Sequence, residues 1–388
     1  MAQNNVHTSS SSTSCKFLIV LLFLHSNLLL LIPGVVSVKV TPFPSDPAAL
    51  STWESSNILP FSARANDPEL DPAIKEAEKS PVTIRVRKDG SGQFKTVTEA
   101  VNSIPEQNKK RAIIVIGPGT YVEKIKVPRS KPFVTFYGEK ASDMPKLTFN
   151  GDAAKYGTVD SSSVITESDY FMAVNIVFEN SSPPPDGKRK NAQAVAIRVS
   201  GTKSSFFNCK FYGYQDTICD DRGLHFFKDC FIEGTEDFLF GSGTSLYLKT
   251  TLHSVAKDKA GVITAQAREK EDDTGYVFVH ATIQGSGAGN TVLGRAWKPY
   301  AKTIFVYSSM DDSVKPEGWD NHRDVKNEKT VYFAEYQCTG PGASKTGRVK
   351  FAKMLTEQEA KPYLDMEYIK GSTWIVAPPA VNTLSAAI

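Results

Sequence analysis

Short strands that recur along the chain constrain its fold more than any other feature of the sequence. Each unit has an aromatic or aliphatic pair, a small or polar residue and a further apolar residue before a turn, and the units recur at about 20 residues or more. They are YFMAVNIVFEN at 170–180, SFFNCKFYG at 205–213, HFFKDCFIEG at 225–234 and VFVHATIQG at 277–285. One such unit buries its apolar face only by stacking on the next. The repeat therefore predicts an all-β fold, a right-handed parallel β-helix.

Two segments with a helical pattern flank this repeat. Residues 94–105 (FKTVTEAVNSIP) carry apolar side chains at the spacing of a helix, and we expect a short helix that caps the N-terminal end of the solenoid. Residues from Thr356 onward (TEQEAKPYLDMEYI) predict a C-terminal helical segment that packs over the other end. The chain of 388 residues is long enough for two or three ordinary domains, but a solenoid grows by adding coils and remains one domain.

The first 80 residues predict a targeting segment and a spacer. The apolar run Phe17–Ile32 follows a leader whose only charge is Lys16, which is typical of a secretory signal peptide. The run is shorter than the ~20 residues that span a bilayer, which favours cleavage near Val35 and Ser37 over an uncleaved anchor. We therefore expect a signal peptide at 1–37, a spacer rich in Pro, Asp, Glu and Ser at 38–80, and one catalytic domain at 81–388.

Charge excludes some partners. Lys and Arg number 45 and Asp and Glu number 42, so the net charge of +3 provides no strong field for nucleic acid or an anionic membrane. We expect no nucleic-acid partner, no stable membrane association and a monomer.

The secretory route makes cysteine pairing and glycosylation relevant. Cys209 and Cys230 lie 21 residues apart, so the repeat stacks them on adjacent coils, either as a disulfide or as a ladder of buried thiols. Asn180 begins an Asn-Ser-Ser sequon that Pro183 follows, and it is the predicted glycosylation site.

Two aspartates share the same spacing. Asp216 in GYQDTI and Asp237 in GTEDFLFG are 21 residues apart, which places both carboxylates on one face of adjacent coils, about 4.8 Å apart along the stack. Like charges this close cannot both ionise easily, so one pKa should rise and the other fall, giving an acid and a base. A turn residue is the simpler explanation for one aspartate. Asp237, however, precedes Phe238, Leu239 and Phe240, where an unpaired carboxylate would be costly.

Two glutamines and an arginine extend this set. Gln193 and Gln215 are 22 residues apart, and stacked amide groups are suitable donors to a developing oxyanion, although a polar ladder explains them equally well. Arg295 in LGRAW can hold a carboxylate with two hydrogen bonds and keep it ionised.

Five motifs in one order resemble a known family. They are GPGTYVEKI, QAVAIRV, YQDTI, DFLFG and LGRAW, and the similar region runs from about Val82 over most of the remaining chain. Together they resemble plant pectin methylesterases, enzymes that demethylate homogalacturonan in cell walls. The resemblance implies a parallel β-helix, an aspartyl esterase without metal or cofactor, secretion to the plant cell wall, pectin as substrate and a proteinaceous inhibitor as a further partner. It corresponds to the short form of the family, without the N-terminal inhibitor-like region.

The resemblance also implies a role for each candidate residue. Asp237 corresponds to the nucleophile, and Asp216 corresponds to the general acid that then acts as a base. Gln193 and Gln215 match the residues that stabilise the tetrahedral anion, and Arg295 holds the nucleophile ionised. Trp297 offers a flat face to a sugar, and Thr158 in YGTVDSSSV loosely matches a threonine that contacts substrate. The resulting prediction is catalytic roles for five residues and substrate contacts for four, listed as Asp216, Asp237, Gln193, Gln215 and Arg295, and as Thr158, Gln193, Arg295 and Trp297.

Three departures from the family pattern concern residues next to these motifs. Ala296 stands where many members have proline, Ser242 follows DFLFG where asparagine is common, and Glu236 replaces an apolar residue beside Asp237. Because neighbours on a strand point to opposite faces, we expect Glu236 to lie outside the site but to raise pKa values within it.

Pectin depolymerases and a binding protein are the alternatives to an esterase. A polygalacturonase is expected to carry NTD and GHG segments, which are absent. A calcium-dependent lyase needs clustered carboxylates, and Asp272 with Asp273 is better explained as a solvated loop. A wall-binding solenoid without catalysis is the remaining alternative, and it would release no methanol.

Overall fold

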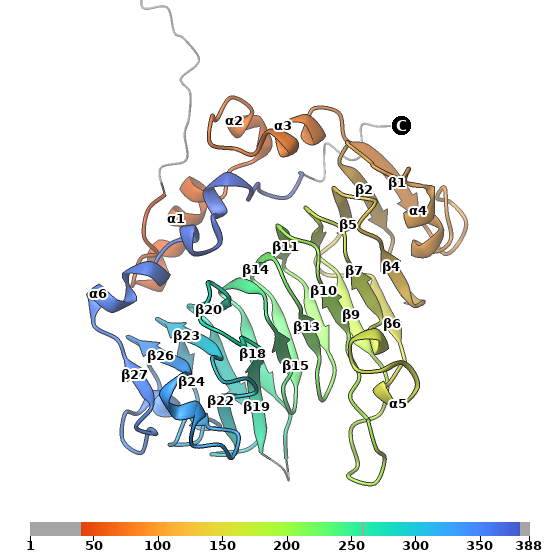
Figure 1. Ribbon diagram of the computed structural model, residues 1–388. Coiled ribbons are helices and arrows are strands. Elements are labelled where there is room, and N and C mark those ends of the chain that lie inside the picture. The colour runs from red at the N-terminus through yellow and green to blue at the C-terminus, as the bar shows by residue number, and fades with distance from the viewer. Residues whose placement is uncertain (1–39, 258–259, 381–388) are drawn as a thin grey trace, which may run out of the picture. The chain divides into compact units, whose positions relative to one another are not determined.

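Three parallel sheets form the walls of the solenoid in the computed structural model, which describes residues 40–257 and 260–380 (Figure 1). The 11-stranded sheet contains β1 (Val82–Val86), β2 (Ala112–Ile116), β5 (Val134–Gly138), β8 (Met172–Val174), β11 (Ser204–Phe207), β14 (Leu224–Lys228), β17 (Thr244–Leu248), β20 (Gly275–Val279), β23 (Lys302–Val306), β26 (Tyr332–Tyr336) and β27 (Ala352–Met354). The second sheet contains β4 (Ile125–Val127), β7 (Val164–Thr166), β10 (Ile197–Val199), β13 (Ile218–Asp220), β16 (Leu239–Gly241), β19 (Gly261–Gln266), β22 (Thr291–Arg295) and β25 (Trp319–Asp320). The third contains β3 (Thr120–Val122), β6 (Lys146–Phe149), β9 (Val177–Asn180), β12 (Lys210–Tyr212), β15 (Phe231–Gly234), β18 (Thr251–Ser254), β21 (Thr282–Gly285) and β24 (Ser309–Met310).

Each strand pairs with the equivalent strand one coil away, as the repeat predicts. Ile197 pairs with Ile218 and Ile218 with Leu239, so the offset is 21 residues on these coils. The offset is not uniform, because Tyr247 pairs with Phe278, a separation of 31 residues. The connection between β19 and β20, residues 267–274, is longer than the equivalent one between β16 and β17, residues 242–243, and contributes much of the difference. The observed architecture confirms the predicted parallel β-helix.

A column of aromatic rings fills the interior behind the 11-stranded sheet. Phe206 stacks on Phe227 with ring centroids 4.6 Å apart, and Phe227 stacks on Tyr247 at 4.5 Å. Phe278 continues the column over Tyr247 at 4.5 Å and is followed by Phe305 at 4.6 Å. These spacings are close to the ~4.8 Å that separates neighbouring strands, so hydrogen bonding and ring packing favour the same rise per coil.

A short helix closes the N-terminal end, as predicted. Helix α4 (Val97–Ser103) begins at Thr96, which forms a capping box with Glu99. Its buried Val97 and Val101 join the interior cluster that also contains the first strands. The helix therefore covers apolar side chains that the first coil would otherwise expose.

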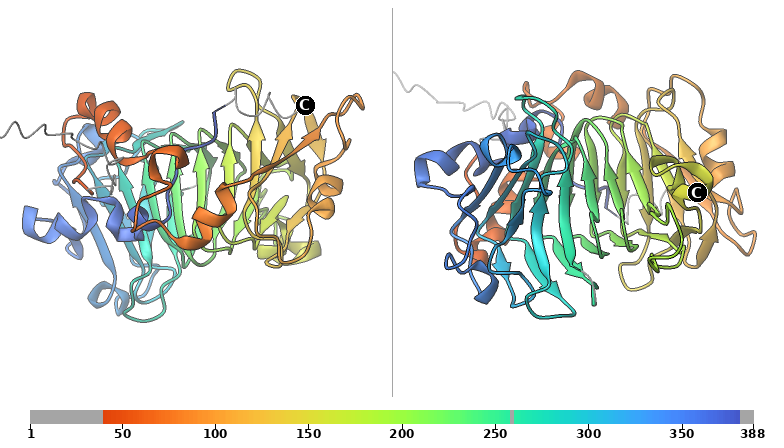
Figure 2. Two further views of the ribbon diagram at one scale, coloured as in Figure 1. Left: turned by 90° about the horizontal axis from the view of Figure 1, so that it is seen from above. Right: turned by 60° about the horizontal axis from the view of Figure 1, so that its bottom comes forward.

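Residues 40–80 differ from the expected spacer. They form α1 (Leu50–Asn57), α2 (Phe61–Arg64) and α3 (Pro72–Glu78), which lie along the outside of the solenoid (Figure 2). Phe43, Trp53 and Leu70 are buried against the outward-facing side chains of the 11-stranded sheet. Their irregular spacing gives no helical period, which explains why composition alone suggested a spacer. The expected signal peptide at 1–37 lies outside the described residues.

The C-terminal segment also packs elsewhere than expected. It contains α6 (Glu357–Ala360) and the 3₁₀ turns η5 (Lys361–Tyr363), η6 (Met366–Ile369) and η7 (Gly371–Thr373). Rather than covering the end of the solenoid, η6 contacts β14 and β17. It also pairs with the N-terminal segment, since Phe43 N–H donates to Leu364 O at 2.6 Å and Asp71 N–H to Thr373 O at 2.8 Å. The two ends of the described chain thus cover one face of the sheet together. No helix in residues 40–257 and 260–380 is long and apolar enough to cross a bilayer.

The structure shows the state of the stacked cysteines and of the predicted glycosylation site. Cys209 and Cys230 are buried as free thiols, so the ladder of thiols is present rather than the disulfide. The side chain of Asn180 is 3% exposed, and its amide nitrogen donates to the carbonyls of Gly151, Ser161 and Val195. A glycan on that nitrogen would break these hydrogen bonds, so the folded chain contradicts the expected glycosylation site.

A buried ion pair within the N-terminal segment also contacts the C-terminal segment. Arg64 and Asp67 are 1% and 0% exposed and lie 2.7 Å apart. Arg64 also donates to Ile375 O at 2.6 Å. Breaking a buried pair from one side leaves an uncompensated charge, whereas an apolar replacement of both partners does not.

We expect Asp67→Ala to lower the free energy of unfolding by about 3 to 5 kcal/mol, because Arg64 remains buried without its carboxylate. The double variant Arg64→Met, Asp67→Leu should recover most of this loss. Urea unfolding followed by circular dichroism measures both. Equal losses in the single and double variants would mean that packing, not charge, dominates at this position.

Candidate active site

Two stacked turns place the aspartates. Asp216 lies between β12 and β13, and Asp237 lies in the equivalent connection between β15 and β16. Both residues have left-handed backbone, with φ of 67° and 51°, which aspartate tolerates better than most residues. Asp216 N–H donates to Glu236 O at 3.0 Å, which aligns Asp216 with Asp237 on adjacent coils. The predicted stacking of the aspartates is therefore present.

The glutamines follow the same ladder. Ala194 N–H donates to Gln215 O at 3.2 Å, the same pattern that joins Asp216 to Glu236. In a parallel ladder these two bonds place Gln193, Gln215 and Glu236 in one row across three coils. The 22-residue spacing of the glutamines thus corresponds to a real stacking position, and Glu236 occupies the next place in the row.

A single pocket of about 280 Å³ contains all seven candidate residues. Its lining also includes three residues that the sequence did not single out: Val159, Phe240 and Ala265. Phe240 lies on β16 one position after the buried Leu239, so strand alternation turns it outward to the floor of the pocket. The alternation within DFLFG is a signal that could have identified it.

Arg295 bridges two carboxylates. Its Nη2 contacts Oδ2 of Asp237, and its Nη1 lies 3.0 Å from Oε1 of Glu236. Oδ1 of Asp237 is buried without a hydrogen-bond partner in the described part of the chain. One oxygen of Asp237 is therefore held by Arg295, and the other is buried without a hydrogen bond.

Glu236 does not line the catalytic pocket, as strand alternation predicted, but it lies closer to the site than expected. It contacts Arg295 directly and so belongs to the charged cluster. Glu236 approaches Arg295 because Asp237 has left-handed backbone and precedes β16, so it does not lie in an extended strand with Glu236. The charge of Glu236 raises the pKa of both Asp216 and Asp237, as expected.

Burial dominates the ionisation of both aspartates. It raises the pKa of Asp216 well above its usual range, and the charges of Asp237 and Glu236 raise that pKa further. Burial raises the pKa of Asp237 to about 6, against the opposing effect of Arg295. The expectation that one pKa falls is therefore wrong, because desolvation outweighs the arginine. The difference between the two groups remains, so Asp237 ionises before Asp216.

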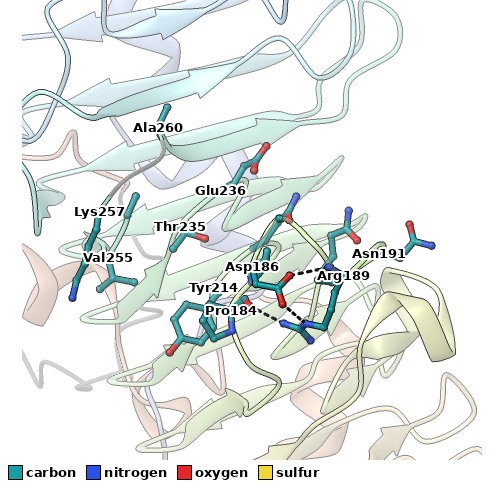
Figure 3. Close-up of a pocket in the computed structure, with 16 residues that line it drawn as sticks. Pro184, Asp186, Arg189, Asn191, Tyr214, Thr235, Glu236, Val255, Lys257 and Ala260 are labelled. Carbon is teal, nitrogen blue, oxygen red and sulfur yellow. Dashed lines mark hydrogen bonds and ion pairs between the residues drawn. The ribbon is translucent and has the colours of Figure 1, made fainter.

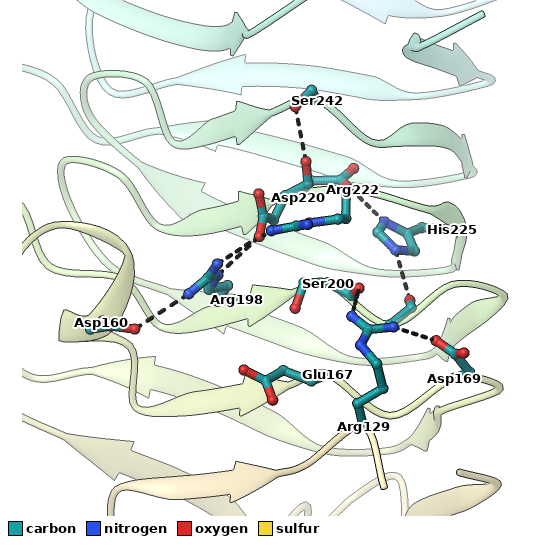
Figure 4. Close-up of polar contacts among 12 residues, drawn as sticks. Arg129, Asp160, Glu167, Asp169, Arg198, Ser200, Asp220, Arg222, His225 and Ser242 are labelled. Atoms are coloured by element: carbon teal, nitrogen blue, oxygen red, sulfur yellow. Dashed lines mark hydrogen bonds and ion pairs between the residues drawn. The ribbon is translucent and has the colours of Figure 1, made fainter.

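Trp297 and Thr158 border the pocket. Trp297 is 46% exposed, and the Arg295 guanidinium lies over its ring at 5.6 Å from the centroid. Thr158 precedes η2 (Val159–Ser161), which is tied to the sheet because Asp160 lies 3.3 Å from Arg198 on β10 (Figure 4).

An anchor inside the solenoid holds the strand that follows Asp216. Asp220 ends β13 and is fully buried, and His225 Nδ1 contacts one of its carboxylate oxygens (Figure 4). The hydroxyl of Tyr247 donates to the other oxygen at 2.6 Å. These contacts limit movement of the turn that carries Asp216. Asp272, the other acidic candidate, instead forms an ion pair with Arg268 at 3.3 Å.

The fold and pocket define the class of protein. The chain superposes on the solved pectin methylesterase from carrot with a TM-score of 0.68 and 31% sequence identity, over 75% of this chain and 92% of that one. The class is thus that of the pectin methylesterase β-helices.

Sequence comparison gives the family. A family model described as pectinesterase matches residues 83–372. Pectinesterase 1 from Olea europaea is 49% identical over 356 residues, which cover 92% of this chain and 96% of the relative. A pectinesterase from Parthenium hysterophorus has the same identity and coverage. The chain belongs to the pectinesterase family and is an enzyme of that family.

The raised pKa of Asp216 has a consequence for stability. Because the folded state binds this proton more tightly than the unfolded chain does, stability present at low pH is lost as pH rises from the unfolded pKa toward the folded one. Asparagine has no proton to lose, so Asp216→Asn should not lose stability in this way as pH rises. We expect the melting temperature of the variant to exceed that of the wild type by about 2 to 4 °C near neutral pH, and by little or nothing at about pH 4. Thermal melts across pH measure the difference, and a constant difference at both pH values would contradict it.

Proposed function

We propose that the chain hydrolyses the C6 methyl esters of homogalacturonan in pectin, with Asp237 as nucleophile. One observation carries the proposal: Asp237 has one oxygen held by Arg295 and a second, Oδ1, that is buried without a hydrogen bond beside Asp216. An ionised, oriented carboxylate next to a carboxyl group that keeps its proton is the arrangement that nucleophilic and general acid catalysis need together.

The first half of the reaction forms a covalent intermediate. Oδ1 of Asp237 attacks the ester carbonyl carbon, and the resulting oxyanion accepts hydrogen bonds from the amide groups of Gln193 and Gln215. The bond between the carbonyl carbon and the methoxy oxygen then breaks, and Asp216 gives its proton to that oxygen. Methanol leaves, and the galacturonate carbonyl remains joined to Asp237 as an anhydride.

The second half consumes water. Asp216, now ionised, takes a proton from a water molecule whose oxygen attacks the same carbonyl carbon. The bond to Asp237 breaks, which restores its carboxylate, and the product carboxylic acid loses its proton to solvent. One ester and one water thus give one galacturonate, one methanol and one proton. Trp297 packs against a sugar ring, and Thr158, which lines the same pocket, also contacts the substrate.

Location and partners complete the proposal. We propose a signal peptide at 1–37, supported by the apolar run Phe17–Ile32, and secretion of a monomer to the plant cell wall. There the substrate is partly methylated pectin, and a proteinaceous pectinesterase inhibitor is the candidate protein partner.

Methanol release from highly methylated pectin tests the activity. The wild type should release methanol without new reducing ends, and Asp237→Asn should lose at least about 10³-fold in kcat, because an amide is a poor nucleophile. Asp216→Asn should lose a comparable amount through slow departure of methanol. New reducing ends would indicate a depolymerase, and the absence of both products would indicate a binding solenoid.

The pH profile tests the two roles. Because Asp237 must be ionised and Asp216 protonated, kcat/KM should be bell-shaped, with an acid limb near the Asp237 pKa of about 6. Glu236→Gln removes a like charge and should move the acid limb to lower pH. Glu139→Gln, which removes a carboxylate paired with Arg87 on an N-terminal coil, is the matched control and should leave the limb unchanged. An acid limb at the same pH in the wild type and in Glu236→Gln would mean that a group other than Asp237 controls this limb.

A further inference from the structure

Glu236 lies where two further pockets meet the catalytic one. The larger, of about 750 Å³, is lined by Glu236 together with Tyr214, Gln193 and Gln215, and Figure 3 shows Glu236 on its wall. The other, of about 550 Å³, is lined by Glu236 with Arg295, His322 and others. Since these pockets share Gln193, Gln215 and Arg295 with the catalytic pocket, a polymer seated at Asp237 places its neighbouring sugars beside Glu236.

The ion-pair cluster around Arg295 has a negative balance of charge. One guanidinium, Arg295, serves two carboxylates, Asp237 and Glu236, so the cluster carries a net charge of one negative unit when both are ionised. The Glu236 side chain is 39% exposed, whereas that of Asp237 is 7% exposed. The uncompensated charge therefore faces the substrate through Glu236.

Other charges line the same two pockets, and several of them are positive. Asp186 and Arg189 pair with each other (Figure 3). Arg189 also donates to the carbonyls of Pro183 and Pro184. The remaining charged or titratable groups that line these pockets, apart from Glu236 and Arg295, are Tyr214, Lys257, Lys315, Asp320, His322 and Arg323. None of these lines the catalytic pocket. Of the two carboxylates paired with Arg295, Glu236 alone reaches both flanking pockets.

We propose that Glu236 is a specificity determinant that disfavours free carboxylates on the sugars next to the ester under attack. This inference rests on the proposed function. A methyl-esterified neighbour is neutral and meets no repulsion, whereas a galacturonate meets a like charge. Glu236 consequently favours densely methylated stretches of pectin and weakens binding of the acidic product.

Inhibition by polygalacturonate, the fully de-esterified polymer, tests this directly. Methanol release from densely methylated pectin is measured at about pH 8, where Asp237 is ionised in wild type and variant alike. Glu236→Gln should lower the inhibition constant of polygalacturonate about fivefold at low salt, the size of one partly exposed charge interaction. The difference should shrink in about 0.5 M NaCl, because salt screens exposed charges.

Glu139→Gln is the matched control. Glu139 is 31% exposed, pairs with Arg87 at 2.7 Å and lines neither pocket, so its removal should leave the inhibition constant at the wild-type value. A Glu236→Gln constant equal to or above the wild-type value, or a fall that salt does not change, would overturn the proposal and leave Glu236 as a support for Arg295.

Direct binding keeps the inference separate from the proposed function. Calorimetric titration of polygalacturonate into Asp237→Asn and into Asp237→Asn, Glu236→Gln needs no turnover. Tighter binding to the double variant supports the role of Glu236, and equal binding overturns it. The absence of methanol release from the wild type, by contrast, would overturn the esterase assignment of the site.

Discussion

Hydrogen bonding between parallel coils, spaced about 4.8 Å apart, is the constraint on which the rest of this structure depends. It brings Phe206, Phe227 and the rings above them to stacking distance, so the interior packs without further adjustment. The same spacing places Asp216 next to Asp237, because Asp216 N–H donates to Glu236 O on the adjacent coil. Core and site are therefore two results of a single ladder.

The ladder of coils buries two carboxyl groups side by side, which makes their ionisation unfavourable. It aligns two buried carboxylates, and burial raises the pKa of each. Arg295 offsets part of this cost for Asp237, which it contacts, and less for Asp216. The resulting difference in ionisation is the physical basis for the separate roles that we propose for the two aspartates. Glu236 shares the same arginine, which leaves one negative charge to face the groove.

Local patterns were sufficient for much of the fold and pocket. The repeat predicted the solenoid, residues 94–105 predicted the capping helix, and the spacing of three pairs of residues predicted their stacking. The packing of residues 40–80 was beyond such patterns. Phe43, Trp53 and Leu70 are too irregularly spaced to indicate a helix, and their burial depends on a sheet far along the chain. The buried amide of Asn180 was hidden for the same reason, since its partners come from other coils and from connections between strands.

By itself the sequence determined the parallel β-helix, the stacking of Asp216 on Asp237 and that of Gln193 on Gln215, because a repeat converts distance along the chain into position in space. The resemblance to a known family added Thr158 and Trp297 to the set of site residues. Only the tertiary structure decided how those residues ionise and which neighbours join them. Asp237 adopts left-handed backbone in a turn, which turns Glu236 toward Arg295 instead of away from it. Burial then outweighs the arginine in setting the pKa of Asp237. Both effects depend on the surroundings that the coils create together, and no spacing of residues encodes them.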